Sequence, residues 1–340
     1  QEFLDRTYTY FDPKDLDYLE YIHKVYGKIS EFKPLKKKKE VIESVEEKQD
    51  LDSKEIEVAE VIGIKQLTED QKDPYKASTV GLGKLISHLL DQGIEDFIIG
   101  LGGSATNDCG IGMLSELGIR FVGKNGEICQ HGISELKKIE KIDYSCKNKK
   151  LEKAKFTIIS DVNSPLYGQK GATYVYSKQK GLKEEDFIQV DEVVENFAKL
   201  VSKELGKDYS SYEGSGAAGG LGFAFLSFLT SSIQSGSSFM INYLDIEQKI
   251  QEVDYLITGE GKLDRQSYMG KAPIELARIA KKYDKKVIFL AGSIIDKELC
   301  NLSDEDKKVV DVSFSIQREL LTLENAMDKT IAKSNIERTI

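Results

Sequence analysis

The stretch Asp96-Phe-Ile-Ile-Gly-Leu-Gly-Gly-Ser-Ala-Thr-Asn-Asp-Cys-Gly-Ile-Gly112 decides how the rest of this sequence is interpreted. Apolar residues 97–99 predict a strand, and the glycines after them remove the Cβ atoms that would keep backbone N–H groups away from a ligand. The hydroxyl and amide residues that follow are helix-capping types, and residues 112–118 have a helix-like apolar pattern. A strand that ends in backbone donors at a helix N-terminus is an anion site, most often for phosphate. The stretch therefore predicts phosphate chemistry.

Strands and helices alternate around this stretch from Glu55 onward. Residues 56–62 fit either a strand or a helix. Further strands are expected over 155–160, 255–258 and 287–291, and helices over 79–92, 186–205, 223–229 and 273–283. A strand, a helix and a strand within a short span indicate a parallel sheet with helical crossovers. The sequence therefore predicts an α/β fold.

The composition of the chain limits the kinds of molecule that the protein is expected to bind. The chain has 340 residues and a formal net charge of −9, which argues against nucleic acid or an anionic membrane as the main partner. Its four cysteines have no CxxC spacing, so reduced thiols are expected rather than a disulfide scaffold or a zinc site. No run approaches the ~18 apolar residues that a membrane helix needs. A cytoplasmic protein that acts on a small molecule is expected.

Two glycine-rich segments are candidates for phosphate binding. The first, Gly100–Asp108, fits a dinucleotide fingerprint only loosely and lacks the lysine that ends a Walker loop. It also resembles the phosphate loop of the GHMP kinases, and a tight turn without a ligand is the structural alternative. The second, Gly214–Gly222, contains a literal GxGxxG, but residues 203–212 before it do not predict a strand. Close helix packing or a hinge explains this second match nearly as well.

A charged segment, residues 259–271, is predicted to form a loop at the carboxyl end of the strand over 255–258, where open parallel sheets bind ligands. It combines carboxylates with cations, namely Glu260, Asp264, Lys262, Arg265 and Lys271. Carboxylates hold Mg²⁺, and cations offset the charge of a transferring phosphoryl group. The alternative is a solvated surface turn with accidental ion pairs.

A further carboxylate, Asp161, follows the strand over 155–160 directly. This position makes it a candidate base or metal ligand. An aspartate that caps a turn before Pro165 is about equally consistent with the spacing.

Eight segments match, in order, the motifs of one known family. They are residues 56–60, 78–83, 98–113, 160–168, 178–181, 214–222, 256–264 and 270–273. At these residues the chain resembles the bacterial glycerate kinase family, over roughly residues 56–327.

The resemblance implies ATP-dependent phosphorylation of D-glycerate to phosphoglycerate, with Mg²⁺ as cofactor. It also implies a Rossmann-like parallel-sheet domain with a second, inserted α/β domain and a cleft between them. We expect an atypical N-terminal segment over 1–54, the inserted domain with the glycine-rich loop over 55–230, and the C-terminal portion of the Rossmann-like domain over 231–340.

The resemblance also implies site residues. Phosphate and substrate contacts would come from Gly102, Gly103, Ser104, Asn107, Asp108, Asn163, Glu260 and Lys271. The expected catalytic residues are Asp161, Asp264 and Lys262, and the expected Mg²⁺ ligands are Asp264 and Glu260. Either Asp161 or Asp264 would orient or deprotonate the attacking hydroxyl.

The sequence also departs from the family pattern. An N-terminal Asp-Ser-Phe-Lys motif and a later Asp-Gly-Gly-Glu-Gly-Thr motif are not found in it. Two alternatives to a glycerate kinase therefore stay open: a non-catalytic metabolite-binding or degenerate member of the family, and a kinase of another small hydroxy acid or sugar. The choice between 2- and 3-phosphoglycerate as product, and a homodimeric state, are left open as well.

Overall fold

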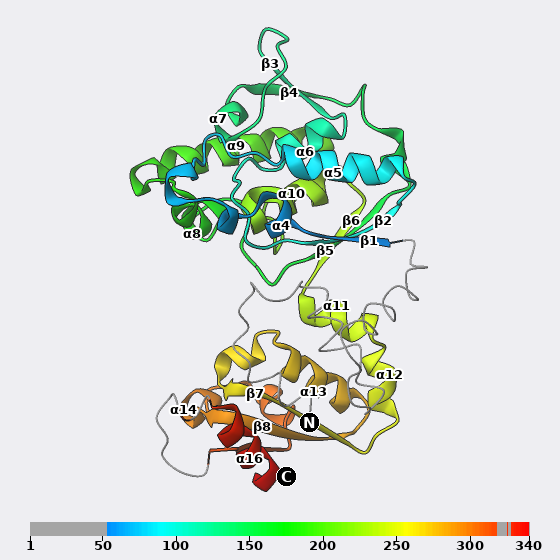
Figure 1. The fold of residues 1–340 in the computed structure, drawn as a ribbon, viewed down its shortest axis with the longest axis vertical. Coiled ribbons are helices and arrows are strands. Elements are labelled where there is room, and N and C mark those ends of the chain that lie inside the picture. Colours follow the sequence, from blue (N-terminus) through cyan, green and yellow to red (C-terminus); the bar gives the residue numbers. More distant parts are fainter. Residues whose placement is uncertain (1–52, 318–324, 326–327, 340) are drawn as a thin grey trace. The chain divides into compact units, whose positions relative to one another are not determined.

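The computed structural model describes residues 53–317, 325 and 328–339. The expected N-terminal segment 1–54 lies almost wholly outside these residues. The described chain forms two compact units, a larger unit of residues 53–234 and a smaller unit from residue 235 onward (Figure 1). The expectation that one domain is inserted into the other stays a prediction.

A four-stranded parallel sheet is the centre of the larger unit. Its spatial order is β1-β2-β5-β6, formed by β1 (Ser53–Glu57), β2 (Asp96–Gly100), β5 (Lys155–Ile159) and β6 (Ser231–Gln234). Glu57 pairs with Gly100, which pairs with Ile159, which pairs with Gln234. The carboxyl ends of all four strands therefore lie along one edge of the sheet, and the predicted parallel α/β fold is confirmed.

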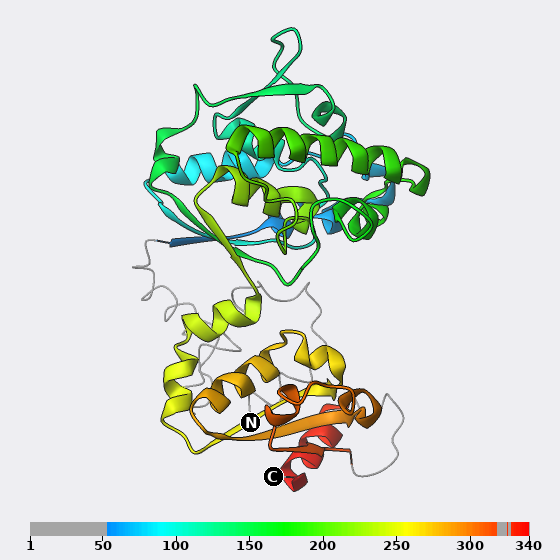
Figure 2. The same cartoon turned by 180° about the vertical axis from the view of Figure 1, so that it is seen from behind.

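Helices and one antiparallel strand pair complete the larger unit, and α9 runs across it as a long helix (Figure 2). The helices are α4 (Val58–Ile62), α5 (Val80–Asp91), α6 (Ile111–Glu116), α7 (Ile133–Leu136), α8 (Ala172–Tyr176), α9 (Phe187–Leu205) and α10 (Ala217–Phe228). The antiparallel pair is β3 (Arg120–Gly123) with β4 (Ile139–Asp143). Short 3₁₀ turns are η1 (Ile64–Gln66), η2 (Glu69–Gln71), η3 (Lys149–Glu152), η4 (Lys178–Lys180) and η5 (Glu184–Asp186).

The ambiguity over residues 56–62 has a simple explanation, because the segment contains both elements. Strand β1 ends at Glu57 and helix α4 begins at Val58. The Glu57 side chain accepts a hydrogen bond from the Ala59 N–H at 3.2 Å and so caps the helix.

Aromatic side chains fill the core of the larger unit. Phe97 of β2 stacks on Phe156 of β5 with ring centroids 4.9 Å apart, and Phe225 of α10 packs against Phe156 at 5.5 Å. All three are buried. Burying such rings contributes a large share of a domain's hydrophobic stabilisation, so α10 and β5 belong to the same cooperative core as β2.

The smaller unit is a three-stranded parallel sheet of order β7-β8-β9, with β7 (Tyr255–Leu263), β8 (Lys286–Ile294) and β9 (Val312–Ser315). Its helices are α11 (Gly236–Tyr243), α12 (Ile246–Gln251), α13 (Ala272–Lys282), α14 (Asp296–Leu299) and α16 (Lys329–Thr339), and its 3₁₀ turns are η6 (Arg265–Tyr268) and η7 (Asp306–Lys308).

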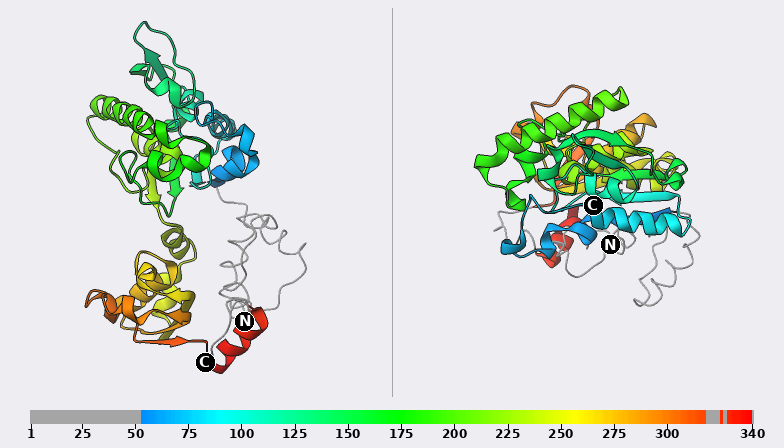
Figure 3. Two further views of the ribbon diagram at one scale, coloured as in Figure 1. Left: turned by 90° about the vertical axis from the view of Figure 1, so that its left-hand side faces the viewer. Right: turned by 90° about the horizontal axis from the view of Figure 1, so that it is seen from above.

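Neighbouring residues of β8 point to opposite faces of that sheet. Phe289 shares a buried cluster with Ile274 of α13, whereas Leu290 shares one with Ile336 of α16. The two helices therefore cover opposite faces (Figure 3). None of the helices in the described part of the chain is both long and apolar enough to cross a membrane.

Strand β7 is longer than the sequence predicted, and the loop expected from Gly259 begins only after Leu263. The prediction was wrong because glycines here serve close strand packing. An ideal Cβ at Gly259 would lie 2.1 Å from the Leu290 carbonyl oxygen, and one at Gly292 would lie 2.5 Å from the Gly261 oxygen. Glycine at these positions allows β7 to continue beside β8.

Candidate functional site

The predicted site residues lie at the carboxyl edges of the two sheets. The glycine-rich loop, Asp161 and Asn163 belong to the larger unit, and residues 260–271 belong to the smaller one.

The glycine-rich loop exposes its backbone at Gly102 and Gly103. Both residues are exposed directly beyond the end of β2. No atom lies within 4 Å of an ideal Cβ at Gly102, and Gly103 has a φ of +54°, a conformation that glycine adopts without strain. The backbone of this pair is therefore accessible, and its contact with a ligand stays a prediction.

The polar residues that follow are buried instead. Ser104, Asn107 and Asp108 have almost no exposed surface. The Asp108 carboxylate accepts hydrogen bonds from the Thr79 N–H at 3.0 Å and from the Thr79 hydroxyl at 2.9 Å. Burial raises the pKa of Asp108, while these hydrogen bonds lower it. The Asp108 side chain thus ties the loop to the start of α5, and direct contact of Ser104, Asn107 and Asp108 with a ligand stays a prediction.

Sequence analysis assigned no role to Lys180, yet it contacts this loop. Its side chain is buried, and Nζ donates to the Thr106 carbonyl oxygen at 2.7 Å and to Ser104 Oγ at 3.2 Å. Burial lowers the pKa of Lys180 to about 8. Nearby, Asn107 Nδ2 donates to Ser177 Oγ at 3.0 Å. The matched segment 178–181 was the only sequence signal for this lysine.

The second glycine-rich segment packs against the first. Gly219 has a φ of +72°, and an ideal Cβ there would lie 2.0 Å from the Thr106 carbonyl oxygen. The Cys109 N–H donates to the Gly219 oxygen at 3.1 Å. The backbone of α10 leaves helical geometry at residues 218–220 to make this approach. The GxGxxG match is therefore explained by close packing.

Other polar residues lie at the same edge of the larger unit's sheet. Asp161 and Asn163 are exposed just beyond β5, where the sequence predicted them. Glu57, which sequence analysis did not select, ends the neighbouring part of the sheet at β1. Its Oε2 lies 2.4 Å from the position of an ideal Cβ on Gly100, and burial raises the pKa of its carboxyl group. Glycine at position 100 thus makes room for this carboxylate.

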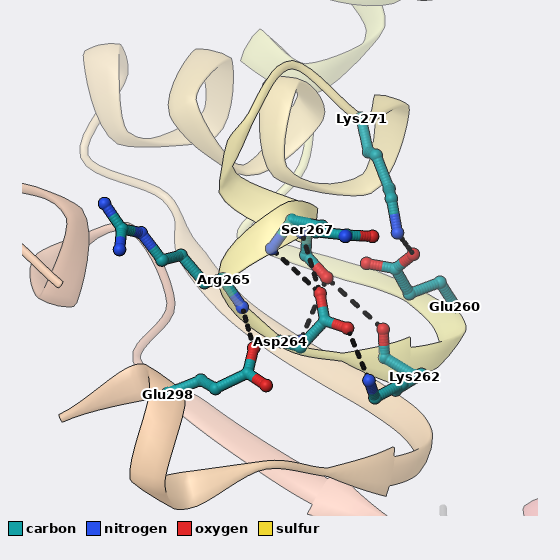
Figure 4. A network of polar contacts seen from close by, with 8 residues as sticks. Glu260, Lys262, Asp264, Arg265, Ser267, Lys271 and Glu298 are labelled. Atoms are coloured by element: carbon teal, nitrogen blue, oxygen red, sulfur yellow. Dashed lines mark hydrogen bonds and ion pairs between the residues drawn. The ribbon is translucent and has the colours of Figure 1, made fainter. Parts of the chain in front are cut away.

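The smaller unit brings its predicted charged residues together at the end of β7 (Figure 4). Asp264 Oδ2 lies 2.9 Å from Lys262 Nζ, and Oδ1 accepts from the N–H groups of Gln266 at 2.9 Å and Ser267 at 3.2 Å. The lysine, above all, lowers the pKa of Asp264. Asp264 is therefore an ionised, fixed carboxylate at neutral pH.

A second ion pair lies beside the first. Lys271 Nζ lies 3.1 Å from Glu260 Oε2, while Glu260 Oε1 is buried without a hydrogen-bond partner. The expected cation Arg265 donates its backbone N–H to Glu298 Oε2 at 3.2 Å. Glu260 and Lys262 are alternate residues of β7, so their side chains point to the same face of the strand, and Asp264 follows directly after the strand end.

The side chains of Glu260 and Asp264 could bind Mg²⁺ only through their carboxylate oxygens. Among residues that the structure describes, no three His, Cys, Asp or Glu side chains gather into a metal site. Mg²⁺ commonly takes only one or two protein carboxylates and completes its shell with water and substrate phosphates. The unpartnered Oε1 of Glu260, close in sequence to Asp264, is a donor of that kind. Glu260 and Asp264 are oxygen ligands of the kind that Mg²⁺ takes, and a Mg²⁺ site on them stays a prediction.

Comparison with known proteins places the chain in a family. The model of the glycerate kinase family matches residues 23–340. A glycerate kinase of Bacillus cereus is 39% identical over 84% of this chain and 73% of its own length, and a glycerate 2-kinase of Escherichia coli is 35% identical over 80% and 70%. A crystal structure of a Salmonella typhimurium protein, provisionally named glycerate kinase 2, aligns with a TM-score of 0.66 at 35% identity, covering 85% of this chain and 76% of that one. The chain therefore belongs to the glycerate kinase family.

Proposed function

We propose that this protein is a glycerate kinase, which transfers the γ-phosphoryl group of ATP to a hydroxyl group of D-glycerate. Family membership over most of the chain supports the reaction class. The observation that carries the proposal is the charged end of β7, where a fixed carboxylate, Asp264, lies beside the cation of Lys262. Phosphoryl transfer needs this combination of positioning and charge compensation more than covalent chemistry by the protein.

In the proposed mechanism, the hydroxyl oxygen of glycerate attacks the γ-phosphorus in line with the leaving ADP oxygen. Lys262 and Lys271 offset the negative charge that gathers on the equatorial oxygens. Asp264 accepts a hydrogen bond from the attacking hydroxyl and takes its proton as the new P–O bond forms. Its lowered pKa keeps it ionised for this task. Asp161, exposed beyond β5, is the alternative residue for the same role.

The larger unit has a candidate anion site of its own in the backbone of Gly102 and Gly103, with Asn163 as a further polar group at the same edge of its sheet. Ser104, Asn107 and Asp108 would support this backbone from within. Mg²⁺, when bound with ATP, would be held by Glu260 and Asp264 and would neutralise phosphate charge.

A coupled assay of ADP release with D-glycerate and MgATP tests the proposal. Turnover that depends on glycerate supports it, and ³¹P NMR of the product then distinguishes 2- from 3-phosphoglycerate. Calorimetric binding of glycerate without turnover would instead support a non-catalytic metabolite-binding protein. Turnover with another hydroxy acid or sugar from a substrate panel, and none with glycerate, would support a kinase of different specificity.

We further propose a cytoplasmic location and a homodimeric state. The unpaired state of Cys109, Cys129, Cys146 and Cys300 supports a reducing compartment. Cell fractionation and light scattering of the purified protein test the two statements separately.

A further inference from the structure

We propose that Lys180 is a positioning residue, which holds the glycine-rich loop so that the backbone of Gly102 and Gly103 keeps the shape that binds a phosphate group. The inference deepens the proposed function and rests on it. Lys180 is buried, and its Nζ donates to two residues of the loop itself, Ser104 and Thr106, so it acts through the loop.

Three side-chain hydrogen bonds join the loop to the segment of α8 and η4. Lys180 Nζ donates to Thr106 O at 2.7 Å and to Ser104 Oγ at 3.2 Å. Asn107 Nδ2 donates to Ser177 Oγ at 3.0 Å. These partners are more than 60 residues apart in sequence, so the contacts fix a tertiary arrangement. We call the pair Lys180 and Ser177 the loop clamp.

Backbone contacts restrain the loop on its other sides. The Ile64 N–H donates to Gly103 O at 2.8 Å, and the Ala105 N–H donates to Ile62 O at 2.9 Å. Gly219 packs directly against Thr106 O. Fixed donors bind an anion with little reorganisation, which is what a preorganised phosphate site requires.

A buried lysine at this position lowers the stability of the folded protein, so its presence suggests a functional role. Burying an ammonium group disfavours its charged form, so a neutral side chain would suit a purely structural position better. The charge of Asp108 offsets part of this cost. A cation in contact with Ser104 and Thr106 also makes the electrostatic potential along the neighbouring loop backbone more favourable to a phosphate. Both the hydrogen bonds and the charge thus serve the same backbone.

Lys180→Met tests the inference, because methionine keeps the length of the side chain and removes its ammonium group. The control is Lys178→Met, which removes a lysine of the same turn η4 that is 73% exposed and paired with Glu184. We expect Lys180→Met to raise the KM for ATP at least tenfold with a smaller change in kcat, and Lys178→Met to change neither. Lys180→Arg should recover part of the loss.

Hydrogen exchange in the apo protein supplies a readout that does not need activity. Amides of residues 102–109 should exchange at least tenfold faster in Lys180→Met than in the wild type, while amides of β2 and β5 keep their rates. If the wild type proves inactive with glycerate but the loop alone loses protection, the proposed function fails and the positioning role stands. Unchanged exchange and unchanged KM in a folded Lys180→Met protein would overturn the positioning role.

Ser177→Ala covers the case in which Lys180→Met fails to fold. It removes only the hydroxyl that Asn107 contacts. We expect a smaller rise in the KM for ATP, of about threefold, with faster exchange confined to residues 102–109. Wild-type exchange in this variant would argue against the clamp.

Discussion

Two buried aspartates show how the surroundings of a side chain set its task. Asp108 lies among backbone N–H groups and a threonine, and burial raises its pKa. Asp264 lies beside Lys262, which lowers its pKa and keeps the carboxylate charged. A carboxylate whose oxygens accept hydrogen bonds from the surrounding protein suits a structural role, whereas a fixed anion beside a cation suits phosphoryl transfer.

The first prediction concerns Asp264→Asn. Asparagine is also a good cap, so it can still accept the N–H groups of Gln266 and Ser267. The anion is lost, however, and with it the acceptor for the proton of the attacking hydroxyl. We expect kcat to fall by about 100-fold or more and KM to change by less, as measured by steady-state ADP release.

Asp311→Asn is the matched control. Asp311 also has a lowered pKa, forms an ion pair with Lys281 and accepts the Val287 N–H at 2.7 Å. It lies just before β9, at the opposite edge of the sheet from Asp264. We expect kcat to be retained. An unchanged kcat in Asp264→Asn would remove Asp264 from the mechanism.

The second prediction concerns the pH dependence of stability. The pKa of Lys180 is about 8 in the folded protein and 10.5 as the reference for an unfolded chain. Between these values the unfolded state binds more protons, so the free energy of unfolding rises with pH through this window. The rise attributable to Lys180 should be at most about 3 kcal/mol. Urea unfolding at pH 7.5 and 10 should show it in the wild type, and an equal rise in Lys180→Met would contradict it.

For single residues, the sequence shows which side chains are charged but not which of them become buried in the fold. Asp264 was selected as a candidate because it follows a predicted strand among other charged residues. Lys180 and Glu57 were missed because a lysine in a short polar turn and a glutamate in an ambiguous segment resemble solvated residues. Their roles depend on what packs over them, namely the 104–107 loop and Gly100. Tertiary contact of this kind leaves no local signal.

At the scale of elements, the two glycine-rich segments form one structure. Gly219 and Gly220 have positive φ angles and lie against Thr106 and Cys109, so α10 braces the loop after β2. The sequence predicted both segments but not their contact. It also misjudged β7, because the same residue type marks turns in one place and close strand packing at Gly259 in another.

The third prediction follows from that contact. Gly219→Ala should lower the free energy of unfolding by about 3 kcal/mol, since it adds overpacking against Thr106 O to the strain of a positive φ. Gly206→Ala is the control: its φ is +68°, and no atom lies within 4 Å of the added Cβ. It should cost only about 1 kcal/mol. Equal losses in chemical denaturation would show that the packing against Thr106 relaxes freely.

At the scale of the whole molecule, each unit has a buried cluster of its own. In the larger unit, strands β1, β2 and β5 each place buried side chains in the cluster. Strand β6 contributes Ile233, which is partly buried and packs against the cluster. The smaller unit's principal cluster lies between α13, β7 and β8. A unit with its own core meets the main requirement for independent folding.

The fourth prediction is that residues 36–234, produced alone, fold cooperatively. The core needs no side chain from the smaller unit, because the buried residues packed around Phe97 and Phe156 all come from this range. Thermal denaturation followed by circular dichroism should give one sigmoidal transition. A fragment of residues 36–214 is the control: it lacks Phe223, Phe225 and strand β6, and should show none. A transition in the shorter fragment, or none in the longer one, would mean that the stability of this unit comes from elsewhere in the chain.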